Sequence, residues 1–403
     1  MSDGRDTMYA YYAAQEVLPT YGGFESEADL AAHERHRRRL FTDKLKLPPR
    51  LFAGARLLEL GPDAGENSLV FARWGAECHL AEPHLRAHET IRSYFEHFGL
   101  TGRLAALEHA DLEGYPAPDA PDDRFHVVDA EGFVNAIQPV SAWIDKLAQL
   151  LAPEGLAVVF YNERFGGLLE LTWKVVNARH RELIGAGSLD SARALFGTKW
   201  DSIPHKRAIE SWAMDVLENP FVRLRFFVEP VSMCVQAAAA GLRLYSSWPD
   251  YCGGLDPFWF KRERSTEEET AGTAEFIRRS RLSHVFGRRH FLTGDPAPVE
   301  DQLSQLVIDF DSLIDGFDAA VAARCDRALA DTARTLSSAA VLTSDADRKQ
   351  SLATVAMLRS LLELLACGSA DEIRMFANAD RAFVESWGMP SHFAVFRRDD
   401  RRS

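Results

Sequence analysis

Short apolar runs alternate with longer amphipathic stretches from residue 55 onward, the pattern typical of βαβ units built around a parallel sheet. The apolar runs predict five strands, at residues 56–60, 77–81, 104–109, 125–129 and 156–161. The stretches between them predict helices at residues 68–74, 87–98 and 140–151. Upstream, residues 27–47 mix alanine, leucine and charge at helical spacing until a Pro-Pro pair ends the pattern.

The regular alternation stops after residue 161, and isolated helical pieces at 168–183 and 209–217 indicate an insertion. Residues 231–241 then predict a helix that ends at a glycine, and residues 242–247 predict a sixth strand.

The C-terminal part of the chain carries few strand signals. Residues 264–273, RSTEEETAGT, are interpreted as a polar linker or loop. Apolar positions three or four residues apart predict one helical stripe within 299–334 and a second within 352–365, which could pack as an antiparallel hairpin. Alternation in HFAVFRR, residues 392–398, predicts a last strand that rejoins the sheet.

Composition places the chain among soluble globular proteins, with 46% hydrophobic and 26% charged residues. The 46 basic and 59 acidic residues give a net charge of −13, which repels a phosphate backbone, so nucleic acid is not an expected partner. Basic runs at 35–39 and 278–289 are interpreted as solvated helix faces.

Five cysteines are far apart and form no C-x-x-C pair, and no histidine spacing suggests zinc, so no metal site is predicted. The N-terminus is polar, and no uninterrupted apolar window approaches 18 residues. We therefore expect a cytoplasmic protein that does not bind a membrane.

The densest chemical signal is LLELGPDAGENSLVFARWGAECHLAEP, residues 57–83, where a strand runs into a glycine-bearing turn, a helix and a second strand that ends in an acid. In open α/β sheets ligands sit at the carboxyl ends of such strands. Asp63 and Glu66 occupy positions where a dinucleotide fingerprint needs glycine, and their charge disfavours a phosphate ligand. S-adenosylmethionine, which has a ribose and positive charge but no phosphate, fits better.

Residues 59–65, ELGPDAG, resemble the E/D-x-G-x-G-x-G loop of class I S-adenosylmethionine-dependent methyltransferases, with Asp63 where many members carry the middle glycine. The resemblance implies that Glu82 binds ribose, that Asp111 contacts the adenine amino group, and that Glu131 faces the methionine moiety. It implies cofactor-binding roles for Glu59, Gly61, Pro62, Asp63, Gly65, Glu82, Asp111, Leu112 and Glu131.

The resemblance also implies an α/β fold: a Rossmann-like doubly wound, mostly parallel seven-stranded sheet with helical insertions and an α-helical C-terminal region. Its last strand should lie antiparallel between the fifth and sixth. We divide the chain into an N-terminal helical segment (1–50), a cofactor-binding core (51–161), a helical insertion and candidate substrate cap (162–229), a core continuation (230–248), a mostly helical insertion or cap (249–391), and the closing strand and tail (392–403).

The implied function is methyl transfer to oxygen or nitrogen of a small-molecule or sugar-type acceptor. Glu163 and His205 are the candidate proton acceptors. The alternative is a non-catalytic regulatory or interaction protein that binds S-adenosylmethionine, and a nicotinamide oxidoreductase is a weaker third. The helical stripes are expected to form a cap or a homodimer surface. An aromatic run predicts either a wall of the acceptor pocket or a small core: Trp248, Tyr251, Phe258, Trp259 and Phe260.

Overall fold

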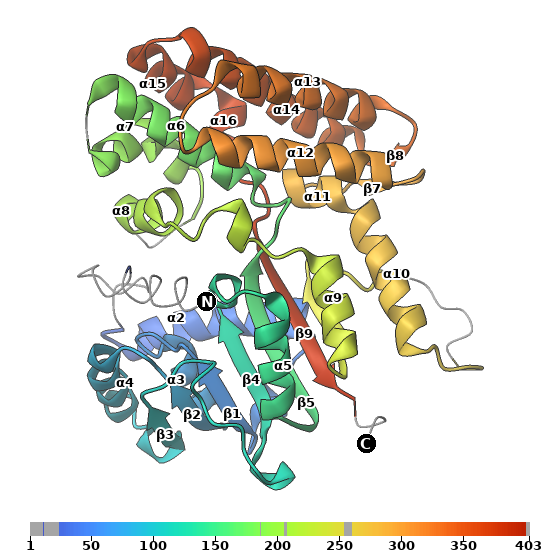
Figure 1. Cartoon of the computed structure of the whole chain (residues 1–403). Coiled ribbons are helices and arrows are strands. Elements are labelled where there is room, and N and C mark those ends of the chain that lie inside the picture. The colour runs from blue at the N-terminus through green and yellow to red at the C-terminus, as the bar shows by residue number, and fades with distance from the viewer. Residues whose placement is uncertain (1–10, 12–23, 186, 205–207, 254–259, 400–403) are drawn as a thin grey trace. The chain divides into compact units, whose positions relative to one another are not determined.

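Seven strands form one sheet in the order β3-β2-β1-β4-β5-β9-β6 (Figure 1). They are β1 (Arg56–Leu60), β2 (Glu77–Ala81), β3 (Leu104–Glu108), β4 (Phe125–Glu131), β5 (Leu151–Asn162), β6 (Leu242–Trp248) and β9 (Ser391–Arg398). The pairs β1–β2, β1–β4, β2–β3 and β4–β5 are parallel, and β9 lies between β5 and β6, antiparallel to β6. The predicted fold class is confirmed, including the return of the last strand.

The computed structural model describes residues 11, 24–185, 187–204, 208–253 and 260–399. The chain divides into two units. The first contains residues 1–161, 230–276 and 392–403, and the second contains residues 162–229 and 277–391.

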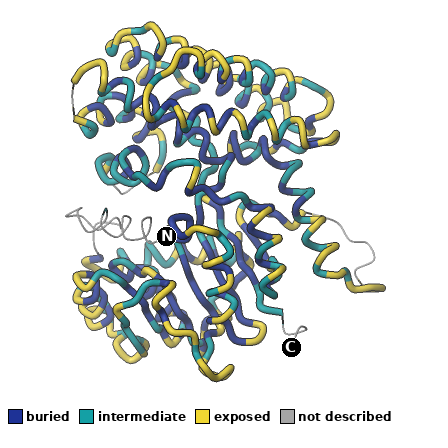
Figure 2. Tube along the Cα trace, in the orientation of Figure 1, coloured by how far each residue is buried: buried dark blue, intermediate teal, exposed yellow. Residues whose placement is uncertain are grey.

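Helices cover the sheet of the first unit because its strands are apolar on both sides, as the buried traces of β1, β4 and β5 show (Figure 2). The helices of this unit are α2 (Glu27–Arg38), α3 (Glu66–Arg73), α4 (Leu85–His97), α5 (Val140–Leu150), α9 (Pro230–Ala239) and the start of α10 (Thr266–Arg279). Helix α2 packs on α3, and α5 packs on α9. One core joins α2, α3 and α4 to Leu57, Leu80, Val127, Val158 and Val395 of the strands.

The interpretation of residues 264–273 as a linker or loop was wrong, because α10 begins there. The backbone N–H of Glu268 donates to the Ser265 hydroxyl at 3.2 Å, and the Glu268 carboxylate accepts from the Ser265 N–H at 3.0 Å. This reciprocal capping satisfies two donors at the helix start. The Ser-x-x-Glu spacing was visible in the sequence, but the density of polar residues masked it.

The second unit is mostly helical. It contains α6 (Leu168–Ile184), α7 (Ser188–Trp200), α8 (Ile209–Trp212), α11 (Arg281–Phe286), α12 (Ala297–Leu313), α13 (Ala319–Ser337), α14 (Asp345–Cys367), α15 (Ala370–Ala379) and α16 (Arg381–Glu385), with a small hairpin of β7 (Phe291–Leu292) and β8 (Val341–Leu342). Leucine, phenylalanine and tryptophan side chains from these helices build a core of its own.

The stripe predicted within 299–334 is two helices instead of one. Helix α12 ends at Leu313, and α13 begins after Asp318, whose carboxylate accepts from the N–H groups of Ala320 at 2.7 Å and Val321 at 3.2 Å. Helix α13 packs against both α12 and α14, so three helices replace the predicted hairpin. The apolar spacing happened to continue across the break, and only the N-cap and Gly316 signalled it.

Helix α14 is long and apolar enough to cross a membrane by length and composition alone. It buries Val355, Leu358, Leu361, Leu362 and Leu365 in the core of the second unit. The core helix of a soluble protein meets the same criterion, so this feature is weak evidence for a membrane span.

Candidate functional site

The loop between β1 and α3 depends on two glycines. Gly61 has φ +66° and Gly65 has φ +90°, both in the left-handed region that disfavours side chains. A Cβ on Gly65 would lie 3.1 Å from Cγ1 of Ile91, and one on Gly61 would lie 3.3 Å from the Phe133 ring. The loop therefore needs glycine at both positions for conformation and for space.

Asp63 also adopts the left-handed conformation, with φ +52°. Aspartate is one of the few residues other than glycine that tolerate this region. The substitution at the middle position of the motif thus keeps a backbone conformation that glycine would adopt most easily.

Glu82 directly follows β2 and ties this loop to the neighbouring strand. Its carboxylate accepts hydrogen bonds from the backbone N–H groups of Asp63 at 3.0 Å and His84 at 2.7 Å. The residue is only 2% exposed, and burial raises its pKa to about 7 although the two hydrogen bonds favour the charged form. A carboxylate held in this way has lone pairs left for the hydroxyl groups of a ligand.

Three acids lie on one face of the sheet where β1 and β4 end. Glu59 is opposite Asp129 in the parallel register, and Glu131 follows Asp129 by two residues on the same strand. Glu59 accepts from the Ser68 hydroxyl of α3. Asp129 is 1% exposed, and within the described ranges neither of its carboxyl oxygens has a hydrogen-bond partner.

Arg37 of α2 pairs with Glu131 through two hydrogen bonds, at 2.9 and 2.6 Å. Its guanidinium lies over the rings of Phe41 at 4.7 Å and Phe71 at 5.5 Å, and the residue is 7% exposed. The interpretation of residues 35–39 as a wholly solvated face was therefore wrong. The position of Arg37 on the inner face of α2 brings it to an acid far away in sequence.

These groups, with the buried Glu66 at the start of α3, form what we call the acidic cluster: Glu59, Glu66, Asp129, Glu131 and Arg37. Four carboxyl groups thus share one arginine. Burial raises the pKa of Glu59 to about 8, and burial followed by repulsion from Glu131 raises the pKa of Asp129 well above its usual range. The acidic cluster consequently has room for further positive charge.

Nearby His33 supplies none of this charge at neutral pH. Its ring nitrogen Nε2 is 3.0 Å from the Asn67 side-chain oxygen at the start of α3, and burial lowers its pKa to about 4. The contact instead holds α2 on α3.

Asp111 and Leu112 lie in the turn after β3. The Asp111 carboxylate accepts from the Gly114 N–H at 2.6 Å, and Leu112 is 1% exposed. This hydrogen bond stabilises the turn, which accounts for an aspartate at position 111 without a ligand. Its contact with an adenine stays a prediction.

Glu163 lies in the second unit. It is fully buried, and its carboxylate accepts from the N–H groups of Phe165 at 2.9 Å and Gly166 at 2.6 Å. Its other oxygen pairs with Arg281 at 3.2 Å. These partners account for the residue without a substrate, so its role as a proton acceptor stays a prediction. His205 lies outside the described residues.

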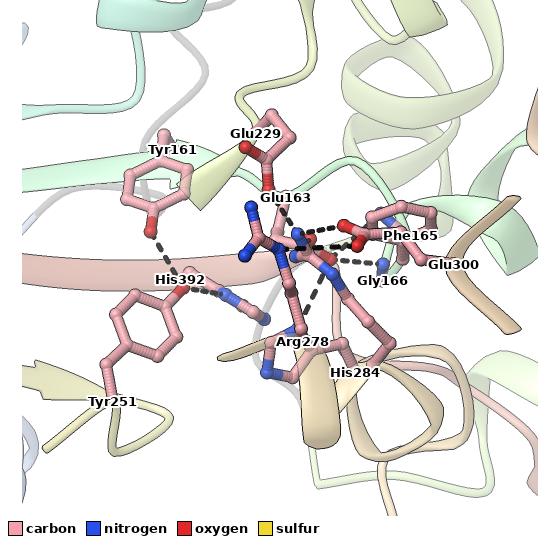
Figure 3. A network of polar contacts seen from close by, with 11 residues as sticks. Tyr161, Glu163, Phe165, Gly166, Glu229, Tyr251, Arg278, His284, Glu300 and His392 are labelled. Carbon is pink, nitrogen blue, oxygen red and sulfur yellow. Dashed lines mark hydrogen bonds and ion pairs between the residues drawn. The ribbon is translucent and has the colours of Figure 1, made fainter. Parts of the chain in front are cut away.

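Arg281 overturns the second prediction of a solvated basic run. Its side chain is fully buried and lies over the Phe165 ring at 4.4 Å. It pairs with Glu163, with Glu229, and with Glu300 at 2.9 Å; Figure 3 labels these three glutamates. We call these four charged residues the Arg281 network.

The described residues of the predicted aromatic run differ in exposure, and the choice between a pocket wall and a small core stays a prediction. Tyr251 is fully buried, whereas Phe260 is 64% exposed and Trp248 is 36% exposed. Phe258 and Trp259 are not among the described residues.

Sequence reasoning missed Arg37 and Asp129. Asp129 did carry a signal, because an aspartate at the end of the apolar run FHVVD is unusual for a strand that is buried on both faces. Arg37 carried none, since its neighbours in the run are also basic.

Residues 32–247, more than half of the chain, match the model of a protein family described as "Methyltransferase domain". No curated protein matches the chain. A solved structure described as a putative sarcosine dimethylglycine methyltransferase from Galdieria sulphuraria is 10% identical, with 99% of each chain covered and a TM-score of 0.37.

Two further structures align over part of the chain. PKMT2 from Rickettsia typhi, solved with AdoHcy, is 17% identical over 61% of this chain and 50% of that one, with a TM-score of 0.40. The N-methyltransferase NodS from Bradyrhizobium japonicum WM9, solved with S-adenosyl-L-homocysteine, is 15% identical over 38% of this chain and 74% of that one, with a TM-score of 0.28.

Proposed function

The chain belongs to the S-adenosylmethionine-dependent methyltransferases, and from this premise we propose that it methylates an oxygen or nitrogen atom of a small-molecule or sugar-type acceptor. We assign cofactor binding to particular residues because of the acidic cluster, which lies beside the glycine loop. Its residue Asp129 is buried, and the Asp129 carboxyl has no hydrogen-bond partner among the described residues. A cytoplasmic location and a homodimer remain part of the prediction.

The residues present fit S-adenosylmethionine. Gly61 and Gly65 let the loop pack closely against Phe133 and Ile91, where a Cβ would crowd those side chains. Glu82 offers a carboxylate to ribose hydroxyls, and the surplus of acids at the ends of β1 and β4 suits a sulfonium and an ammonium. A ligand with phosphates would meet repulsion from the same acids.

The bound cofactor supplies an electrophilic methyl group. The chain contributes position and charge. The glycine loop lets the backbone approach the ligand, Glu82 orients a ribose, and the acidic cluster offsets positive charge in a site sheltered from water. Holding two reactants in line at about 3 Å supplies much of the rate of such a displacement, so a strong base is required only when the acceptor must lose a proton before or during attack.

Cofactor binding is the first test. Calorimetry should detect S-adenosylmethionine and S-adenosylhomocysteine, and Gly61→Arg should abolish both signals because its side chain would enter the loop beside Phe133. Gly102→Arg is the matched control, since a Cβ there meets nothing within 4 Å. Loss of binding in both variants, or no binding by the wild type, would refute the assignment.

Acceptor class is the second test. The protein is incubated with methyl-labelled cofactor and a small-molecule extract, and labelled products are identified by mass spectrometry. We expect the label on oxygen or nitrogen of small molecules. Label confined to protein or nucleic acid, or carried on carbon, would contradict the proposed acceptor while leaving methyl transfer intact.

A further inference from the structure

Three buried side chains of the first unit form a hydrogen-bonded chain. The hydroxyl groups of Tyr161 and Tyr251 lie 2.7 Å apart, and the Tyr251 hydroxyl also hydrogen-bonds to Nδ1 of His392 (Figure 3). All three residues are fully buried. The cofactor site described above uses none of them.

The topology places the three residues at one edge of the sheet. Tyr161 is the penultimate residue of β5, and Tyr251 follows the end of β6 by three residues. His392 is the second residue of β9, and because β9 runs antiparallel to β6, its first residues lie where β6 ends. This is the carboxyl edge of the parallel strands, where ligands of open α/β sheets bind.

Tyr161 is the member closest to the cofactor strands. In the parallel register of β4 and β5, Phe160 is opposite Glu131, the last residue of β4, and Tyr161 comes next. The N–H of Gly132 donates to the Phe160 carbonyl at 3.4 Å, which keeps the two strand ends together. The hydrogen-bonded chain thus begins beside the strand that carries the acidic cluster and leads away from it.

Proton counting restricts how this chain can be arranged. Each tyrosine hydroxyl has one proton to donate, so Tyr251 donates at most one of its two hydrogen bonds. When both point toward His392, Nδ1 of the imidazole is the acceptor and Nε2 carries the ring proton. A neutral imidazole in this tautomer can then accept a proton at Nδ1.

We propose that Tyr161, Tyr251 and His392 form a proton relay for a hydroxyl acceptor, with Tyr161 as the end that meets the acceptor. The inference rests on the proposed function and narrows it to an acceptor whose oxygen must lose a proton. Tyr251 and His392 act through Tyr161 and are positioning residues in this scheme.

The step balances without any other reactant. The acceptor oxygen forms a bond to the methyl carbon while the carbon–sulfur bond breaks and its electron pair stays on sulfur. The acceptor proton passes to the Tyr161 oxygen, the Tyr161 proton passes to Tyr251, and the Tyr251 proton passes to Nδ1 of His392. The products are a methyl ether, a neutral thioether and an imidazolium, whose proton returns along the same chain to water that enters when the product leaves.

The experiment compares Tyr251→Phe, which removes the central hydroxyl and keeps the ring, with Tyr245→Phe on β6, which is 45% exposed and serves as the control. For hydroxyl acceptors we expect Tyr251→Phe to lower kcat about 100-fold, the lower end of what a positioned base contributes. Its KM and its cofactor affinity should change less than about twofold if the relay alone is lost. Transfer to neutral amines should be unchanged, as it should in Tyr245→Phe.

A second measurement needs no turnover. Nitrogen NMR of the free protein should show His392 with the proton on Nε2. Thermal unfolding and cofactor binding of each variant establish that it is folded.

Different results would contradict the proton relay and the proposed function. A proton on Nδ1 in the free protein, an unchanged kcat in folded Tyr251→Phe, or equal losses for hydroxyl and amine acceptors would overturn the relay. A wild-type enzyme that methylates amines alone would also overturn it, yet the proposed methyl transfer would stand. Absence of cofactor binding would instead refute the proposed function.

Discussion

Arg37 and Arg281 are alike in sequence and differ in what surrounds them. Each lies in a basic run, is buried, and rests on phenylalanine rings. In the second unit the three glutamates around Arg281 all receive donors from arginine or from the backbone. In the first unit Arg37 is committed to Glu131, and Asp129 receives no hydrogen bond from any described residue.

This difference in hydrogen-bond donors distinguishes buried charges that stabilise the fold from buried charges that await a ligand. A buried carboxylate without a donor lowers stability, because its hydration is lost and nothing replaces it. In the Arg281 network each glutamate has such a donor, although Nε of Arg281 itself has no hydrogen-bond partner among the described residues. The acidic cluster contains a buried carboxyl without a donor, so its arrangement becomes favourable only when a proton or a cationic ligand is present.

The largest expected effect is that of Arg281→Met. It leaves Glu163 buried without its cation, and breaking a buried pair from one side costs about 3–5 kcal/mol of unfolding free energy. Urea unfolding of the full chain measures the loss. Arg278→Met is the control, because Arg278 is half-exposed and its ion pair with Glu300 is long, at 3.5 Å, so it should cost less than about 1 kcal/mol. Equal losses would remove the distinction between the network and an ordinary surface pair.

Glu163→Gln should lower the free energy of unfolding by about 2 kcal/mol, since an amide accepts the backbone donors of Phe165 and Gly166 less strongly and pairs poorly with Arg281. The same unfolding measurement is combined with kcat. If the residue were instead the proton acceptor predicted from sequence, stability would hardly change and kcat would fall.

Cofactor affinity should rise up to about tenfold between pH 6 and pH 8, because the pKa of Glu82 is raised to about 7 and the carboxylate form accepts ribose hydroxyls better than the acid. The sign follows from ionisation: the carboxylate is a minority form below the pKa and the majority form above it. Calorimetric titrations across this range measure the effect. Glu82→Gln should bind more weakly and lose most of the pH dependence, and a full slope in this variant would assign the titration to another group.

The smallest change in the free energy of unfolding is expected for Asp129→Asn. The sign of this change distinguishes the acidic cluster from the Arg281 network. Removing a buried carboxyl that lacks donors should raise the stability of the free protein by about 1 kcal/mol or leave it unchanged at pH 8, while cofactor affinity falls. Thermal unfolding with and without S-adenosylmethionine separates the two effects. A loss of stability as large as that of Glu163→Gln would show that Asp129 is structural too.

Local signals predicted much of the fold and part of the site. Strands β1 and β2 have the bounds that the apolar runs predicted, and the glycines between β1 and α3 do take left-handed conformations. The wrong predictions overlooked helix N-caps. One is the serine at the start of α10, and the other is the aspartate that begins α13 after the break from α12.

The sequence by itself determined the alternation of strands and helices from β1 to β5, the glycine loop and the acid after β2, because these depend on side-chain periodicity and backbone conformation over a few residues. Tertiary structure alone decided which charges meet in the interior. Arg37 and Glu131 are 94 residues apart, and Tyr251 and His392 are 141 residues apart. Whether such groups are buried and paired depends on how helices pack on the sheet and which strands become neighbours, and no short stretch of sequence carries that information.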